Sequence, residues 1–172
     1  MSFTEKERIE ILDKFVGGRE ITEDTLALYK DKFEKIEETL YRGMPFYKEY
    51  IKPGTLIQEW YGATHWSLDF NVARGIYSDN YINELYVEEL VDKLNLSYDD
   101  TYNSFVPMVM RIKGFSRGAR TYEMVKDLEF VSRFYKEMEV TTMNIDTIIT
   151  NVEIKNDEKG TYYLVDVEEV PR

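Results

Sequence analysis

An alternation of apolar and polar residues near the end of the chain constrains the fold most strongly. Apolar or β-branched side chains recur at every second position over residues 148–154 and 163–167, and residues 156–160, rich in Asn, Asp and Gly, separate the two runs. Because successive side chains of a β-strand point to opposite faces of the sheet, each run predicts a half-buried strand. Two such strands joined by this turn predict a β-hairpin.

Other segments show a helical period. Apolar residues at helical spacing predict a helix over residues 5–16, and a second stripe, starting after Thr22 and continuing to Leu40, predicts another. Residues 81–94 return to this spacing. The segments expected to be extended are 40–44, which ends at Pro45, and 55–60, 63–67 and 105–112. The pattern predicts one α+β domain over residues 1–172, with helices first and a mostly antiparallel sheet system after them.

Composition excludes several classes of protein. The net charge of −11 disfavours a general nucleic-acid binder. With no cysteine and one histidine, disulfides, thiolate metal sites and a serine–histidine triad are not expected. No apolar run reaches the roughly 18 residues of a membrane span, and no signal peptide is visible. We therefore expect no membrane contact, no metal and a cytoplasmic location, in a protein of phage or bacterial origin.

Two glutamates, Glu137 and Glu139, are the most suggestive residues for function. They lie two positions apart at the expected start of a strand, directly after the aromatic pair Phe134 and Tyr135. In a strand, both carboxylates point to the same face. Like charges at that spacing are costly unless a ligand requires them. A solvated strand face in an acidic protein is the alternative interpretation.

Two upstream segments accompany the glutamate pair. In residues 40–45, Arg42 is followed by Gly43 at an expected strand end, and in residues 65–73 a strand carries Ser67 before a helix start. Arginine, then serine, then Glu-x-Glu is the motif order of the mono-ADP-ribosyltransferases of the R-S-E class, which this chain resembles. Within this class the chain resembles the phage and bacterial-toxin enzymes that modify arginine.

The resemblance implies an architecture and a reaction. Residues 40–172 would form a two-sheet ADP-ribosyltransferase-like catalytic core, and residues 1–39 an accessory helical region. NAD⁺ would be a substrate, and its ADP-ribose would pass to a macromolecule, expected to be an arginine side chain of a host protein, with RNA as a second acceptor class. Such an effector would act in the host bacterial cytoplasm.

The resemblance also assigns roles. Glu139 would stabilise the positive charge that develops on the ribose, and Glu137 would orient or deprotonate the nucleophile. Arg42 would clamp the diphosphate through its forked donors, with Gly43 allowing close backbone approach. Ser67 would order the site near Glu139.

Three further residues follow from the resemblance. His65 stands where the family pattern Ser-Thr-Ser has its first serine, and its imidazole can donate a hydrogen bond to a carboxylate or a ribose hydroxyl. Phe134 and Tyr135 fall in the turn that recognises the target. Two other functions stay open: an acidic binding protein without enzymatic activity, and an NAD⁺ glycohydrolase with water as acceptor.

A basic segment, residues 111–120, stands out in this acidic chain. It carries Arg111, Lys113, Arg117 and Arg120 and no acid, and its two glycines predict a flexible loop after a buried strand. The loop could contact the phosphates of NAD⁺, an RNA or an acidic partner, or it could offset acidic neighbours.

Overall fold

The computed structural model of the chain describes Thr4, Lys6 and residues 33–58, 63–125, 137–143 and 145–171. The strands are β1 (Glu34–Tyr47), β2 (Leu56–Ile57), β3 (Ala63–Ser67), β4 (Phe105–Gly118), β5 (Glu139–Met143), β6 (Ile145–Asp157) and β7 (Gly160–Pro171). The helical segments are η1 (Lys48–Tyr50), α3 (Phe70–Val72), η2 (Ala73–Tyr77), α4 (Glu84–Leu94), α5 (Tyr98–Asn103) and α6 (Thr121–Val125).

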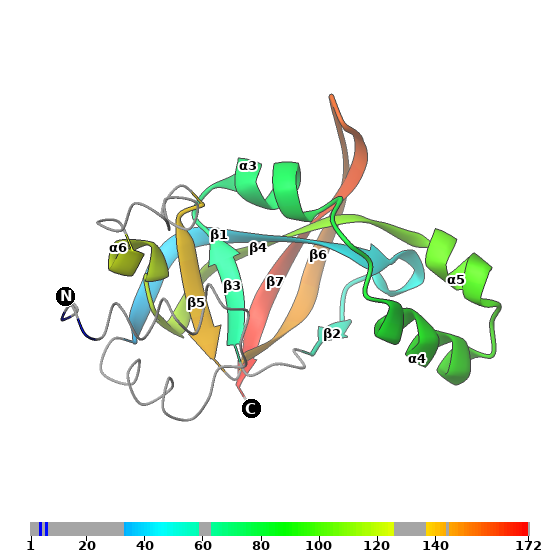
Figure 1. Cartoon of the computed structure of the whole chain (residues 1–172), viewed down its shortest axis with the longest axis horizontal. Helices are drawn as coiled ribbons and strands as arrows, with labels where there is room; N and C mark the ends of the chain where they lie inside the picture. The colour runs from blue at the N-terminus through cyan, green and yellow to red at the C-terminus, as the bar shows by residue number, and fades with distance from the viewer. Residues whose placement is uncertain are drawn as a thin grey trace.

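The strands join in one mixed sheet with the order β2-β6-β7-β4-β1-β3-β5 (Figure 1). Among the described strands only β4 and β7 pair in parallel. The expectation of a mostly antiparallel arrangement is therefore confirmed, whereas the expectation of two sheets is wrong. The part of the sheet from β2 to β1 is joined to the β3–β5 pair by a short contact between β1 and β3, in which Tyr41 lies opposite Ser67. This junction is where the candidate site forms.

Several expected elements are confirmed. The C-terminal hairpin is β6 and β7, paired from Ile145 opposite Pro171 to Asp157 opposite Gly160. Helix α4 begins after Asn83, whose side chain accepts a hydrogen bond from the Leu85 amide, and ends at Asn95 in a left-handed conformation. Strand β3 covers the segment expected to be extended.

The N-terminal region brings one correction. Both expected helices lie largely outside the described residues, but the described end of the second, Glu34–Leu40, is the first half of β1. Ile36 and Leu40 are both buried there. A separation of four places two residues on one face of either a helix or a strand, so this pair could not distinguish the two periods. Strand β1 also continues past Pro45, which lies opposite Pro107 in β4.

The basic segment brings a second correction, because it is strand and not loop. Strand β4 continues to Gly118 alongside β1. Gly114 marks an irregularity: its φ is +86°, and a Cβ there would lie 2.2 Å from the carbonyl oxygen of Ile36. The register between β1 and β4 shifts on either side of Ile36. The glycine thus permits a β-bulge within a continuing strand.

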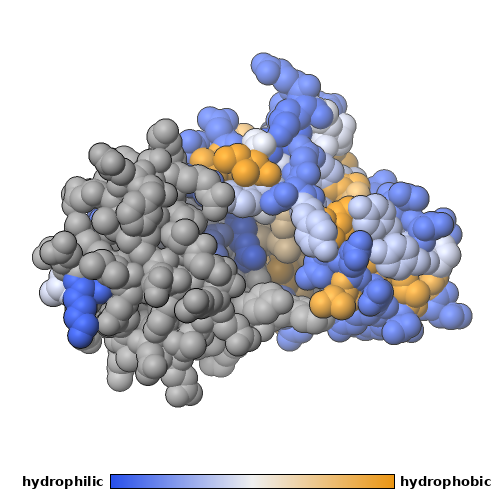
Figure 2. Space-filling model, viewed as in Figure 1, coloured by the Kyte–Doolittle hydropathy of each residue, from blue (hydrophilic) through white to orange (hydrophobic). Residues whose placement is uncertain are grey.

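The main core lies between the sheet and its covering segments. Leu40, Met108, Met110, Val140 and Val165 are fully buried in it. Figure 2 shows the opposite character at the projecting end of the β6–β7 hairpin, which is hydrophilic. None of the helices within the described ranges is long and apolar enough to cross a membrane.

Candidate active site

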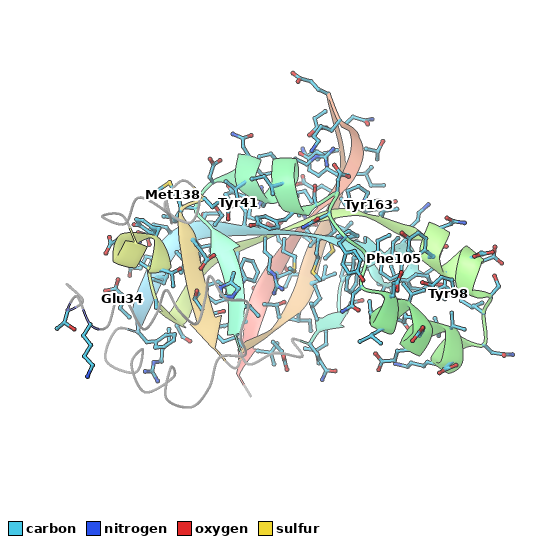
Figure 3. All side chains as sticks on the ribbon, viewed as in Figure 1. Glu34, Tyr41, Tyr98, Phe105, Met138 and Tyr163 are labelled. Carbon is cyan, nitrogen blue, oxygen red and sulfur yellow. The ribbon has the colours of Figure 1, made fainter. Side chains whose placement is uncertain are left out.

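A cavity of about 360 Å³ opens where β1 and β3 meet. Its lining comes from β1, β3, the helical segment after β3, and the turn before β5: Tyr41, Arg42, Gly43, His65, Trp66, Ser67, Val72, Ala73, Tyr77, Glu137 and Glu139. Figure 3 labels two residues that mark the region, Tyr41 on β1 and Met138 before β5. The volume of the cavity falls in the range of small-molecule sites, roughly 300–1,000 Å³.

Strand β1 contributes Arg42, the one arginine among the described residues that line the cavity, and the neighbouring Gly43. A Cβ on Gly43 would lie 2.0 Å from the carbonyl oxygen of Ala73. A close approach that requires glycine is therefore made by the backbone of η2, whereas the approach of a ligand's diphosphate to Gly43 stays a prediction. Gly43 lets the helical segment press against β1 and form one wall of the cavity.

Strand β3 contributes Ser67, which is 5% exposed and organises the turn before β5. Its hydroxyl donates a hydrogen bond to the main-chain carbonyl of Glu137 and accepts one from the amide of Asp69. The amide of Leu68 bonds the carbonyl of Met138 at 3.2 Å. Ser67 thus ties the turn to β3 through main-chain atoms, and it does not bond either carboxylate.

Glu139, the first residue of β5, points its carboxylate into the cavity with its side chain 13% exposed. Its Oε1 atom lies 3.0 Å from the hydroxyl of Thr121 in α6, 3.4 Å from that of Thr141, and 3.4 Å from Nδ1 of His65. No hydrogen bond from a described residue reaches Oε2. Burial raises the pKa of Glu139, but His65 and the two hydroxyls outweigh this effect, so the pKa lies below its usual value.

Glu137 differs from the expectation, since it precedes the strand. It lies in a turn, and the next residue, Met138, adopts a left-handed backbone with a φ of 48°. The two glutamates therefore do not project side by side from one strand face, although both line the cavity. Glu137 is 6% exposed, and its Oε2 accepts a hydrogen bond of 2.8 Å from the hydroxyl of Tyr77.

The structure brings together the residues expected from β1, β3 and the glutamate pair. Phe134 and Tyr135 lie outside the described residues. Sequence reasoning missed Tyr77 and Thr121. No sequence motif marks either residue. Tyr77 is one of 14 tyrosines, and Thr121 contacts Glu139 only because the fold brings α6 and β5 together.

No residue of the basic segment lines the cavity, and two of its arginines are balanced by carboxylates. Arg111 binds Asp166 through Nε at 2.7 Å. Arg120 binds Glu34 at 2.9 Å and Glu38 at 2.7 Å. These contacts favour the interpretation that the segment offsets acidic neighbours.

Comparison with solved structures identifies the fold. The chain is similar to the Vis toxin, an ADP-ribosyltransferase from Vibrio splendidus, with 17% identity, a TM-score of 0.50, and coverage of 96% of this chain and 74% of the other. A structure of Vis with the M6 inhibitor gives 18% identity and a TM-score of 0.52, covering 98% and 83%. A structure of Vis with agmatine gives 16% identity and a TM-score of 0.52, with coverage of 96% of this chain and 75% of the other.

The chain therefore has the fold of the ADP-ribosyltransferases, in agreement with the resemblance seen in its motifs. Sequence comparison adds nothing further, because no family model and no curated protein matches.

Proposed function

We propose that this protein is an NAD⁺-dependent mono-ADP-ribosyltransferase that modifies arginine side chains of a host protein. One observation carries the proposal: three motif segments distant in sequence bring Arg42, Ser67 and Glu139 to one cavity. This arrangement occurs in a chain with the fold of known ADP-ribosyltransferases. An arginine, an ordering serine and a partly buried carboxylate match the needs of NAD⁺ cleavage.

The proposed reaction breaks one bond and forms another at C1 of the nicotinamide ribose. The bonding electron pair leaves with the nicotinamide nitrogen, and positive charge develops on the ribose as in glycoside hydrolysis. A guanidino nitrogen of the acceptor supplies the pair for the new C–N bond and releases one proton. The products are ADP-ribosylated arginine, nicotinamide and a proton.

Each residue has a proposed task in this reaction. Glu139 remains ionised, because its pKa is lowered, and its carboxylate stabilises the developing charge. Arg42 supplies a cation with forked donors for the diphosphate. Glu137 receives the proton of the acceptor. His65 holds Oε1 of Glu139 from the side of β3.

The choice of arginine as acceptor has two supports. Glu137 provides a second carboxylate in the cavity, which can attract a guanidinium and take its proton. A similar structure, that of Vis, contains agmatine, and agmatine carries the guanidinium group of arginine. The proposed place of action is the cytoplasm of a host bacterium.

Incubation with NAD⁺ labelled in its adenylate portion tests the proposal. With agmatine or a bacterial lysate as acceptor, we expect free nicotinamide together with ADP-ribosyl-agmatine or labelled protein, both detected by mass spectrometry. A Glu139→Gln variant that remains folded at the assay temperature serves as the control. Nicotinamide release with labelled free ADP-ribose and no labelled acceptor would favour the glycohydrolase, and no release at all would favour the binding protein.

A further inference from the structure

Tyr77 makes a direct contact with the buried carboxylate of Glu137. Its hydroxyl donates a hydrogen bond to Oε2 at 2.8 Å, across 60 positions of sequence. A buried carboxylate needs such donors, because it has lost most of its contact with water. A fixed donor also restricts which way the carboxylate can point.

Tyr77 is the last residue of η2, a π-helix whose position is tightly constrained. The amide of Ser78 bonds the carbonyl of Ala73 at 2.8 Å, which closes the wide turn. The same carbonyl presses on Gly43, where even one added carbon would clash. Short π-helical turns inside a helix often occur at functional sites, where they redirect a side chain.

A buried arginine fastens η2 to the β6–β7 hairpin. Arg74 is 3% exposed and binds both carboxylate oxygens of Asp157, at 2.8 and 2.9 Å. It also bonds Asp79 at 2.8 Å and lies over the ring of Tyr162 at 4.6 Å. Lys159 bonds the carbonyl of Gly75 at 2.7 Å. The hairpin rises beside this helical segment in Figure 1.

We propose that Tyr77 is a positioning residue for transfer to a guanidinium acceptor, and that Arg74 and the hairpin end keep it in place. The inference rests on the proposed function. A guanidinium must lose a proton before its nitrogen has an electron pair to donate, and its pKa above about 12 makes that loss demanding. Water already has such a pair. Correct orientation of Glu137 therefore matters more for transfer than for hydrolysis.

The first test compares Tyr77→Phe with Tyr102→Phe. The first variant keeps the ring and removes the hydroxyl that contacts Glu137; the second removes the hydroxyl of an exposed tyrosine on α5. We expect Tyr77→Phe to lower kcat for transfer to agmatine about ten-fold, or about 1.4 kcal/mol, with KM for NAD⁺ and the rate of hydrolysis within about two-fold. Tyr102→Phe should change none of these quantities.

The second test addresses the hairpin. Asp157→Asn removes the charge that binds Arg74. Glu158→Gln makes the same change at the neighbouring turn residue, which forms no hydrogen bond or ion pair with Arg74 in the described part of the chain. We expect Asp157→Asn to reduce the ratio of transfer to hydrolysis about three-fold, a smaller change than Tyr77→Phe because the contact with Glu137 is retained. Glu158→Gln should leave the ratio unchanged.

A readout without turnover separates this inference from the proposed function. In protein labelled with ¹³C at glutamate carboxyls, the signal missing from Glu137→Gln identifies Glu137. That signal should move in Tyr77→Phe and stay in place in Tyr102→Phe. Equal loss of transfer and hydrolysis in Tyr77→Phe, or no loss of either, overturns the inference while the wild type remains active. A wild type without nicotinamide release overturns the proposed function, and the inference with it, even if the signal moves.

Discussion

The cavity at β1 and β3 and a groove beside β4 both contain acidic and basic side chains, but they balance charge differently. The groove is the larger, at about 550 Å³ against about 360 Å³. In the groove, the Arg111 guanidinium holds the pKa of Asp166 below its usual value through a direct ion pair. In the cavity, hydroxyls and one imidazole contact Glu139, and a tyrosine hydroxyl contacts Glu137.

This difference shows why the smaller cavity is the better candidate for catalysis. A carboxylate paired with a guanidinium forms a nearly neutral unit, and little of its field remains for a ligand. A hydroxyl donor stabilises the ionised carboxylate without cancelling its charge. The charge of Glu139 can therefore act on a cationic ligand in the cavity, whereas that of Asp166 is tied to Arg111.

Replacing one carboxylate from each region gives the largest expected contrast. Glu139→Gln should lower both transfer and NAD⁺ hydrolysis by about 100- to 1,000-fold, the usual loss for one key electrostatic group. Asp166→Asn should leave both rates near those of the wild type. Nicotinamide release measures both variants, with thermal unfolding as the check on folding. Near-normal turnover in a folded Glu139→Gln protein would remove Glu139 from catalysis.

The second prediction separates the roles of the two glutamates in the cavity. Glu137→Gln should lower transfer to agmatine about 100-fold, as expected when a general base is lost. NAD⁺ hydrolysis should continue, because the charge on the ribose is assigned to Glu139. Chromatographic separation of ADP-ribosyl-agmatine from free ADP-ribose measures the two products in one reaction. Equal loss of both would mean that Glu137 serves NAD⁺ or the local structure.

The third prediction compares the arginines of the two regions. Arg42→Ala should raise the dissociation constant for NAD⁺ ten- to a hundred-fold, since a charge-assisted hydrogen bond contributes about 1.5–3 kcal/mol. Arg42→Lys should recover only part of the affinity, because an ammonium lacks the fork. Arg111→Ala should not alter NAD⁺ affinity. Calorimetric titration decides the matter, and equal affinities for wild type and Arg42→Ala would exclude the clamp.

The smallest expected effect is on stability at acid pH. Because the folded pKa of Glu139 is lowered, its ionised form stabilises the folded state above its ordinary value of 4.5, and this contribution disappears as pH falls through the lower folded value. The Tm advantage of wild type over Glu139→Gln, no more than about 4 °C, should shrink over that range. Thermal unfolding in a series of acidic buffers measures it. An advantage that grows as pH falls would contradict the lowered pKa.

Local patterns sufficed to predict much of the fold. The β6–β7 hairpin and α4 each carry one clear period with turn or cap residues at the ends, so their type follows from sequence. The type of the first half of β1 does not follow from sequence, because Ile36 and Leu40 fit both the helical and the strand period. The segment 111–118 reads as a loop from its charges and glycines, yet pairing with β1 makes it a strand.

The sequence by itself determined which residues could form the site. Arg42, Ser67 and Glu139 stand in short motifs whose order is visible without any structure, and the fold then places them around one cavity. Only the tertiary structure decided how they are held. The contacts of Glu139 with Thr121 and of Glu137 with Tyr77 join segments 18 and 60 positions apart. Such contacts depend on strand order and on the π-helical turn at η2, and no local period or propensity encodes them.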